Sequence, residues 1–402
     1  MQGRLRNMTF KTLYLKRRED KRLQAGHLWV FSNEIDTKKS PLKSFEPGET
    51  VNVLSSEGKN LGSAYVNPHS LIAARIYDEH KNCELSQEWF EQRFSQALAL
   101  REMMFDKPYY RLCFSEGDFI PGLIVDRFND CFVLQINTAG IEAAKVQMLG
   151  ALENLFSPRT IVLRNDSASR TLESLEKTVD LVKGEITEDI CLEENDVKYR
   201  VDVLKGQKTG WFYDQRISRK NMMPQVKGKT VLDIFSYTGS WSICAASAGA
   251  NEVTAIDVSQ AALDKLVKNA EMNDVQDKVK IVCDDAFNAM QAMSHEKQVF
   301  DVVFIDPPAF IKRKKDIKEG QQAYIRANRL AMNLVKPGGL LVSSSCSYHM
   351  SQANLQNSLL KASRKLKRSI QVLSYGYQGP DHPIHPAIEE SAYLKTITVR
   401  VN

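Results

Sequence analysis

Apolar and polar residues follow a regular order over the C-terminal half of the chain. Helical spacing of apolar residues, clearest over 261–272, separates short apolar runs that predict strands. Strands that alternate with helices are typical of a mostly parallel sheet with helices on both faces. We therefore predict an α/β domain over residues 191–402. Its expected strands lie at 230–235, 252–257, 278–282, 301–305, 339–345, 371–375 and 393–399.

The N-terminal half has a different pattern. Up to residue 78, alternating runs and turn residues predict short strands at 12–15, 50–54 and 71–76, with one short helix in 18–26 that ends before Gly26. Residues 79–190 predict helices over 88–105 and 141–155, a hairpin of 123–128 with 131–136, and a strand over 160–164. We therefore expect three domains, with boundaries at 1–78, 79–190 and 191–402.

The stretch 231–240 is central to the third domain. Its apolar residues predict a strand, the small residues after them predict a tight turn, and 241–247 predict a helix. A second strand ends shortly afterwards at Asp257, and an acid at this place in a nucleotide-binding α/β unit bonds to ribose hydroxyl groups. The turn lacks the G-x-G-x-x-G pattern of a pyrophosphate site. A cofactor with ribose and adenine but no phosphate fits better, and S-adenosylmethionine is such a cofactor.

Four acids lie at or just after predicted strands, where parallel strands form one ligand crevice. They are Asp233, Asp257, Asp285 and Asp306. We expect Asp257 to bind the ribose and Asp285 to accept from the adenine amino group, with Ala286 and Phe287 beside the ring. The main chain of the turn is expected at the methionine end of the cofactor, through Ser236, Tyr237, Thr238 and Gly239. Capping of strands or helices is the alternative role for Asp233 and Asp285.

The segment Asp306–Phe310 resembles the Asp/Asn-Pro-Pro motif of methyltransferases that act on nucleobases. It reads Asp306-Pro307-Pro308-Ala309-Phe310 and follows a predicted buried strand. A rigid turn of this kind can hold a carboxylate against the edge of a flat base, with the aromatic ring against its face. The plainer interpretation of the prolines is a turn without function.

One cysteine lies in a small polar turn after the strand 339–345. The C5 carbon of a pyrimidine is a poor nucleophile, and addition of a thiolate to C6 makes C5 reactive towards a methyl donor. Cys346 is therefore the candidate nucleophile, and the carboxyl group of Asp306 is the candidate acid at N3 of the base. The alternative for Cys346 is a small buried side chain, the usual role of a free cysteine.

Charge and cysteine usage narrow the class of protein. The net charge is +5, and basic residues cluster at Lys16-Arg17-Arg18, at Lys312-Arg313-Lys314-Lys315 and at 364–368. Each cluster alone is expected to be a solvated face, but three together favour a polyanionic partner such as RNA.

The seven cysteines are scattered, without a Cys-x-x-Cys pair, so neither disulfides nor a metal site is expected and a cytoplasmic location fits.

Targeting signals are not apparent. No apolar run is long enough for a membrane span, and Met1–Phe10 lacks the apolar core of a secretory signal. Met8 is an alternative start, which would make residues 1–7 an extension.

Taken together, these motifs resemble one family over residues 9–402: the class I methyltransferases with a PUA domain that make 5-methylcytosine in large-subunit ribosomal RNA. The motifs that carry the resemblance are Gly26-His27-Leu28-Trp29-Val30-Phe31, Lys208-Thr209-Gly210, Asp214-Gln215-Arg216, Phe235–Gly239, Asp306-Pro307-Pro308, Ser345-Cys346-Ser347 and Asp381-His382-Pro383. Many relatives have lysine where this chain has Ala309, and the run Lys312–Lys315 can supply that charge instead.

The resemblance implies a fold and roles for residues. The fold is a Rossmann-like class I methyltransferase domain, preceded by a PUA β-barrel over 1–78 and a middle α+β domain. Cys346 is implied to be the nucleophile, and Gln215 and Arg216 are implied to hold S-adenosylmethionine. RNA contact is expected from Lys16, Arg17 and Arg18 in the barrel and from Lys312, Arg313, Lys314 and Lys315 near the site.

Two other functions stay open at this point. The protein could methylate another atom of an RNA base, with Asp306-Pro307-Pro308 placing the base and Cys346 in a structural role. It could also be an RNA-binding assembly factor without catalysis. The sequence identifies neither the base that removes the C5 proton nor the oligomeric state, for which a homodimer is one option.

Overall fold

The structure is a computed structural model that describes residues 10–402. The alternative start at Met8 lies outside these residues. The chain forms two compact units. We call one the N-terminal unit; it contains the residues up to Ile190 with Asp202–Trp211 and Pro380–Ser391. The other, the C-terminal unit, contains Cys191–Val201, Phe212–Gly379 and Ala392–Asn402.

The first sheet of the N-terminal unit has five strands in the order β1-β3-β4-β5-β2. An antiparallel bridge between Leu15 and Ile35 connects β1 to the residues after β2, so the two edges of the sheet meet as in a barrel. Inward-facing aliphatic side chains such as Leu13, Val51 and Val53 fill its core. The strands are β1 (Lys11–Tyr14), β2 (Trp29–Phe31), β3 (Thr50–Leu54), β4 (Asn60–Val66) and β5 (Ile72–Asp78).

The short helix predicted in 18–26 is present, but it begins later in the structure. Only α1 (Lys21–Gln24) forms. Arg18 has a φ of +70°, in the left-handed region, which a right-handed helix cannot contain. No side-chain cap supports the start at Asp20. The predicted start of this helix at Arg18 was therefore wrong.

The second sheet of the N-terminal unit has the order β10-β9-β8-β7-β6. The predicted hairpin is present, and Asn129 in its turn has a φ of +60°. The expected helix over 141–155 is two helices, because the chain leaves helical geometry at Ala144. The elements are α2 (Gln87–Met104), β6 (Tyr109–Phe114), β7 (Leu123–Phe128), β8 (Cys131–Ile136), α3 (Ala139–Ala143), α4 (Lys145–Phe156), β9 (Thr160–Asn165), α5 (Ala168–Leu172) and β10 (Thr178–Lys183).

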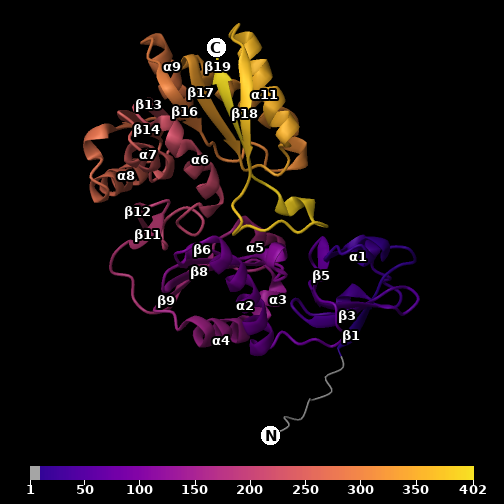
Figure 1. The fold of residues 1–402 in the computed structure, drawn as a ribbon. Coiled ribbons are helices and arrows are strands. Elements are labelled where there is room, and N and C mark those ends of the chain that lie inside the picture. Colours follow the sequence, from indigo (N-terminus) through magenta and orange to yellow (C-terminus); the bar gives the residue numbers. More distant parts are fainter. Residues whose placement is uncertain (1–9) are drawn as a thin grey trace. The chain divides into compact units, whose positions relative to one another are not determined.

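The C-terminal unit contains a seven-stranded sheet in the order β15-β14-β13-β16-β17-β19-β18 (Figure 1). The strands from β15 to β17 are parallel, and β19 is antiparallel to both of its neighbours. All of the strands predicted for this domain are present. They are β13 (Thr230–Ile234), β14 (Glu252–Asp257), β15 (Val279–Cys283), β16 (Phe300–Ile305), β17 (Val335–Ser345), β18 (Ile370–Gly376) and β19 (Lys395–Val401); a separate hairpin pairs β11 (Ile190–Glu194) with β12 (Val197–Val201).

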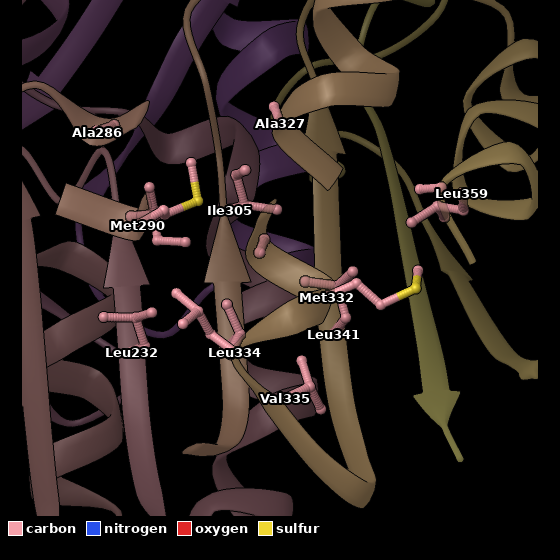
Figure 2. Packing of buried hydrophobic residues seen from close by; sticks show 14 of the residues in the cluster. Leu232, Ala286, Met290, Ile305, Ala327, Met332, Leu334, Val335, Leu341 and Leu359 are labelled. Atoms are coloured by element: carbon pink, nitrogen blue, oxygen red, sulfur yellow. The ribbon is translucent and has the colours of Figure 1, made fainter. Parts of the chain in front are cut away.

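Helices cover both faces of this sheet, as expected for a doubly wound fold. One face is packed by α9 (Ala286–His295), α10 (Ile317–Asn333) and α11 (Gln352–Lys365). The other is packed by α6 (Arg216–Val226), α7 (Ser240–Ser247) and α8 (Gln260–Met272). Figure 2 shows the core under the first group, which contains Leu232 and Ile305 of central strands and Met290, Met332 and Leu359 of the helices.

Central strands of the sheet are buried on both faces, and their sequences are nearly continuous apolar runs for that reason. An acid inside such a strand, like Asp233 in β13, is therefore an exception that calls for a polar partner. Among residues 10–402, no helix is both long and apolar enough to cross a membrane.

Candidate active site

The turn after β13 has a backbone that ordinary residues rarely adopt. Phe235, Tyr237 and Gly239 have φ values of +66°, +50° and +87°, so left-handed residues alternate with others over five positions. Backbone N–H groups of this turn form hydrogen bonds within the protein, since Ser236 donates to the carbonyl oxygen of Ile256 and Gly239 to that of Ser236, both at 2.9 Å. Phe235 and Tyr237 are not glycine, so their left-handed backbone is strained, and such strain is found most often at ligand sites.

Asp257 holds this turn in place. It is the last residue of β14, and its carboxylate accepts hydrogen bonds from the backbone N–H groups of Tyr237 (2.8 Å) and Ser259 (2.9 Å). The side chain of Asn269 on α8 donates to the carbonyl oxygen of Thr238 at 3.0 Å. The carboxyl end of β14 is thus joined to the turn that follows β13.

Asp233 is fully buried next to this turn. Its Oδ2 accepts a hydrogen bond from the Ser242 hydroxyl at 2.5 Å. Burial raises the pKa of Asp233 to about 7, and the nearby carboxylates of Asp306 and Asp257 act in the same direction. Three of the four predicted acids therefore interact electrostatically at one edge of the sheet.

Three buried polar atoms at this edge have no hydrogen-bond partner among residues 10–402. They are Oδ1 of Asp233, Oγ of Ser236 and Oγ1 of Thr238. Buried polar groups are satisfied in the great majority of cases, so such a group points to a missing partner. The methionine end of S-adenosylmethionine carries an ammonium and a carboxylate, which are suitable partners. The residues present fit this cofactor.

Replacement of Gly239 by alanine is expected to weaken cofactor binding and lower the melting temperature. The new Cβ would lie 2.6 Å from Cγ of Leu266, at a residue that also needs a positive φ. The matched control is Gly249→Ala, since Gly249 has a similar φ of +92° but its nearest atom lies at 3.5 Å. We expect the free energy of unfolding, measured by thermal unfolding, to fall by about 1–3 kcal/mol more in the Gly239 variant than in the control. Equal losses in the two variants would contradict the packing argument.

The residues predicted for the adenine end lie at the start of α9. Asp285 is its N-cap, and Oδ1 accepts from the backbone N–H groups of Phe287 (3.0 Å) and Asn288 (3.1 Å). Ala286 is buried in the core, while the half-buried ring of Phe287 lies 4.8 Å from the guanidinium of Arg326 and 6.3 Å from the ring of Phe310. The capping role that the sequence left open for Asp285 is therefore present.

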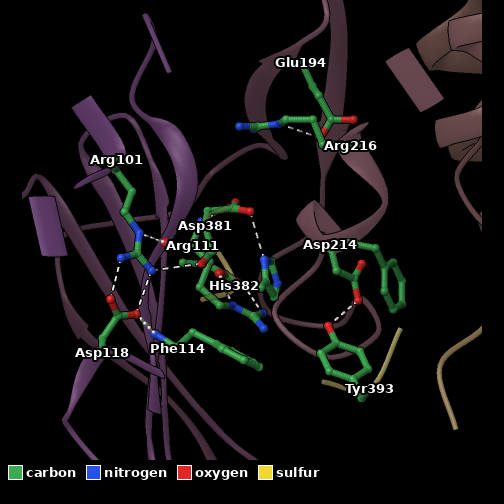
Figure 3. Close-up of polar contacts among 12 residues, drawn as sticks. Arg101, Arg111, Phe114, Asp118, Glu194, Asp214, Arg216, Asp381, His382 and Tyr393 are labelled. Carbon is green, nitrogen blue, oxygen red and sulfur yellow. Dashed lines mark hydrogen bonds and ion pairs between the residues drawn. The ribbon is translucent and has the colours of Figure 1, made fainter. Parts of the chain in front are cut away.

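Gln215 and Arg216 have separate surroundings. Gln215 donates through Nε2 to Oδ2 of Asp306 at 3.1 Å, and its Oε1 accepts from the Thr396 hydroxyl at 3.3 Å. Arg216 forms an ion pair with Glu194 at 3.3 Å (Figure 3). Gln215 therefore orients the predicted acid, whereas Arg216 takes part in a buried ion pair and also lies over the ring of Tyr213.

Cys346 follows the last residue of β17 and is half-buried. The hydroxyl groups on either side of it are fixed: Ser345 donates to Oη of Tyr324 at 2.8 Å, and Ser347 lies 3.1 Å from the same oxygen. Lys395 donates to the carbonyl oxygen of Ser347 at 2.8 Å. The turn that carries the thiol is thus held by α10 on one side and β19 on the other.

A chain of hydrogen bonds connects Asp306 with the strand that carries Cys346. Asp306 follows β16 directly and bonds to Gln215, which bonds to Thr396, and the hydroxyl of Thr396 lies 2.9 Å from that of Ser344. Ser344 is two residues before Cys346. Hydrogen bonds therefore connect the carboxyl ends of β16 and β17, where these two predicted residues lie.

Phe310 is half-buried, and packing of its ring against a base stays a prediction. Its ring makes an edge contact with Tyr324 at 4.8 Å and packs against the hydrophobic core. Pro307 is buried and Pro308 is exposed. The Pro-Pro turn thus has one buried and one exposed proline, between Asp306 and an aromatic ring that contacts the protein interior.

The predicted RNA-binding residues are exposed in both groups. Lys16, Arg17 and Arg18 follow β1 in the N-terminal unit, and Lys312, Arg313, Lys314 and Lys315 lie between β16 and α10 in the C-terminal unit. The backbone N–H of Ile311 donates to the hydroxyl of Ser347 at 3.3 Å. The run Lys312–Lys315 therefore begins one residue after a direct contact with the cysteine turn.

The contacts of some residues could not be predicted from sequence patterns. Lys395 and Tyr324 contact the cysteine turn, but each lies inside an ordinary strand or helix pattern. The segment Asp381-His382, quoted for the family resemblance, is buried in the N-terminal unit, where Asp381 accepts hydrogen bonds from Arg101 and Arg111 (Figure 3). It is a structural part of that unit.

A cavity of about 1130 Å³ lies in the N-terminal unit. Its lining includes His27, Tyr77, Trp89, Arg93 and Phe119, and none of the residues proposed for catalysis or cofactor binding. We assign it no role in the reaction.

Comparison with known proteins identifies two regions of this chain. A PUA-like domain matches residues 13–79, and an S-adenosylmethionine-dependent methyltransferase domain matches residues 167–400. Ribosomal RNA large subunit methyltransferase I from Pseudoalteromonas translucida is 36% identical over 396 residues, which are 97% of this chain and 99% of the relative. The protein of the same name from Vibrio cholerae is 37% identical over 396 residues, with the same coverage.

Solved structures show the same fold. A crystal structure of a methyltransferase in complex with SAH has a TM-score of 0.83, with 21% identity, and the match covers 98% of this chain and 100% of that one. A methyltransferase from Streptococcus mutans has a TM-score of 0.82 at 21% identity, over 97% and 100% of the two chains. The chain is an S-adenosylmethionine-dependent methyltransferase with a PUA-like domain, and it belongs to the family of the ribosomal RNA large subunit methyltransferases I.

Proposed function

We propose that this enzyme forms 5-methylcytosine in large-subunit ribosomal RNA, through a covalent bond between Cys346 and C6 of the base. The arrangement of Cys346 supports this proposal more than any other observation. The thiol lies at the carboxyl end of a central strand, in a turn fixed on two sides, and a hydrogen-bonded chain connects that strand with Asp306. The names of the relatives support ribosomal RNA as the substrate.

The roles of the residues follow from their chemistry. When bound, S-adenosylmethionine supplies an electrophilic methyl group. Asp257 and the turn Ser236–Gly239 would bind and orient the cofactor, and Asp233 would accept from its ammonium group. Gln215 orients the carboxyl group of Asp306, which as an acid donates a hydrogen bond to N3 of the cytosine. We further propose that Arg216, Asp285, Ala286 and Phe287 line the cofactor site.

At the base, Cys346 acts as a nucleophile. The thiolate sulfur forms a bond to C6, and the electron pair of the C5–C6 double bond moves towards N3, where Asp306 stabilises it. C5 then has the electron density to take the methyl group. Loss of the C5 proton restores the double bond, and the C6–S bond breaks to return the thiolate.

The location of the new methyl group tests this function. RNA methylated by the purified protein with labelled cofactor is digested to nucleosides and separated by mass spectrometry. We expect the label in 5-methylcytidine. Label on the exocyclic nitrogen of cytidine, or on another base, would support the alternative in which Asp306-Pro307-Pro308 places the base and Cys346 is structural. The absence of methylation with cofactor bound would support a binding protein.

We also propose that the exposed basic run Lys312–Lys315 binds the RNA backbone beside the target base, with a second contact from Lys16–Arg18. Replacing Lys314 and Lys315 by serine is expected to weaken RNA binding and to reduce the dependence of log Kd on log salt by about 0.7 for each lost phosphate contact. The matched control replaces Lys227 and Lys229, which are also exposed, carry the same charge and belong to none of the basic clusters. An equal change in both double variants would contradict a local contact.

The remaining assignments are also proposals. We propose domain boundaries at 1–78, 79–190 and 191–402; the end of β5 at Asp78 and the contrast between its sheet and the next one support the first. The cytoplasmic location and a homodimeric state stay predictions, which cell fractionation and light scattering can test.

A further inference from the structure

Lys395 is a buried lysine in the proposed catalytic site. It is the first residue of β19 and pairs with Ser345, the last residue of β17, in the antiparallel register of the two strands. Only 7% of its surface is exposed. Lysine is almost never buried to this extent without partners, so its surroundings are expected to serve a purpose.

The amino group of Lys395 has two hydrogen bonds to main-chain oxygens. Nζ donates to the carbonyl oxygen of Ser347 at 2.8 Å and to that of Tyr393 at 2.8 Å. Ser345 and Ser347 are the two neighbours of Cys346, and Lys395 is bound to both, to one by strand pairing and to the other by its side chain. The lysine therefore fixes the turn from both ends of the thiol.

Lys395 and Cys346 also interact electrostatically. Burial lowers the pKa of Lys395 to about 8, and the thiolate of Cys346 acts in the opposite direction and favours the ammonium form. This interaction is mutual, because a pair of opposite charges stabilises both members. An ammonium group next to a cysteine is a known means of favouring the reactive thiolate.

We propose that Lys395 is a positioning residue for Cys346, which holds the turn that carries the thiol and stabilises its thiolate form. The inference deepens the proposed function and rests on it in one respect, namely that the thiolate of Cys346 is the nucleophile. Sequence patterns alone place Lys395 in an unremarkable strand.

The proton balance of this step is simple. The S–H bond of Cys346 breaks, its electron pair stays on sulfur, and the proton passes to solvent water, while the ammonium group of Lys395 stabilises the thiolate. The resulting thiolate adds to C6 of the base. When the C6–S bond breaks at the end of the reaction, the thiolate returns next to the same ammonium group, so no other reactant is needed.

Other titratable groups lie on the elements next to the pair. Tyr324 on α10 bonds to Ser345 and lies next to Ser347, and burial raises its pKa, so it stays a neutral phenol. Asp306 follows β16, and His349 lies in the same turn as Cys346. On β19 itself, Lys395 is the basic residue at the end next to this turn.

The pH dependence of thiol alkylation tests the inference without RNA or cofactor. The full-length protein is treated with iodoacetamide at a series of pH values, and the modification of each cysteine is measured by peptide mass spectrometry. We expect the midpoint for Cys346 to rise by about one pH unit or more in Lys395→Met. In Lys395→Arg, which keeps the charge, we expect most of the shift to be absent. The exposed Cys283 and Cys191 serve as internal references in every sample.

A purely structural role predicts a different result. In that case Lys395→Met would leave the midpoint of Cys346 unchanged, and the inference would be overturned. Thr398→Val is the matched control, a buried change in the same strand without loss of charge, and we expect it to have no effect on the midpoint. If Lys395→Met does not fold, the wild type decides: Cys346 must react at a lower pH than Cys283, and reaction at an equal or higher pH overturns the inference.

The alkylation experiment distinguishes a failure of this inference from a failure of the proposed function. Failure of the function appears as methylation by a Cys346→Ala variant. Failure of the inference appears as an unchanged alkylation midpoint, whatever the methylation result.

Discussion

Replacement of Cys346 by alanine is expected to lower the rate of methyl transfer by at least about 10³-fold. Without the thiolate, C5 of cytosine has too little electron density to attack the methyl group. Cofactor affinity is expected to change by less than about twofold, because none of the residues proposed to bind the cofactor lies on β17. Methylation of a ribosomal RNA fragment and calorimetric titration with S-adenosylmethionine measure the two effects separately.

The control for this experiment is Cys191→Ala. Cys191 is an exposed cysteine of β11, outside the turns that form the site, and we expect full activity from this variant. Cys346→Ser tests the chemistry further, since a hydroxyl group has the same shape as the thiol but is a much weaker nucleophile. Activity of the alanine variant within tenfold of the wild type would show that Cys346 has a structural role.

The second large effect concerns the pH dependence of stability through Asp233. Its pKa is raised from the usual 3.8 to about 7 in the folded protein, mainly by burial. The folded state disfavours the carboxylate. Asp233 therefore leaves the free energy of unfolding unchanged below about pH 4 and lowers it progressively as the pH rises towards 7. One pKa unit corresponds to about 1.4 kcal/mol, so the cost reaches about 4 kcal/mol above pH 7.

The variant Asp233→Asn isolates this contribution. Asparagine has the same shape, can still accept the hydrogen bond from Ser242, and carries no charge. We expect the cofactor-free variant to gain stability over the wild type as the pH rises, by about 1.4 kcal/mol for each unit between pH 4 and 7. Denaturant unfolding at several pH values measures this difference. A difference that does not change with pH would contradict the assignment of a buried acid with a raised pKa.

The α/β domain could be predicted closely because its signals are local. Each strand from β13 to β19 is an apolar run bounded by turn residues, and the carboxyl ends of parallel strands must share an edge. Asp257, Asp306 and Cys346 were placed by this rule alone. The predicted start of the helix in 18–26 was wrong because the left-handed backbone of Arg18 depends on the turn after β1, which no helical pattern reveals.

Other parts of the site depend on contacts between distant segments. Lys395 reaches Ser347 only because β19 returns antiparallel to β17, and Thr396 reaches Gln215 across a long separation in the chain. The short segment Ser115–Asp118 places Asp118 in a buried ion pair with Arg101 (Figure 3). Neither register nor ion pairing of this kind can be read from residue spacing.

The covalent bond between Cys346 and the base is the central claim, and trapping it is the most direct test. RNA that contains 5-fluorocytosine at the target position cannot lose a proton from C5, so the adduct persists after methyl transfer. With S-adenosylmethionine present, we predict a stable protein–RNA species whose crosslinked peptide, identified by mass spectrometry, contains Cys346. Methylation of unmodified RNA without such a species, or a crosslink at another residue, would contradict the account.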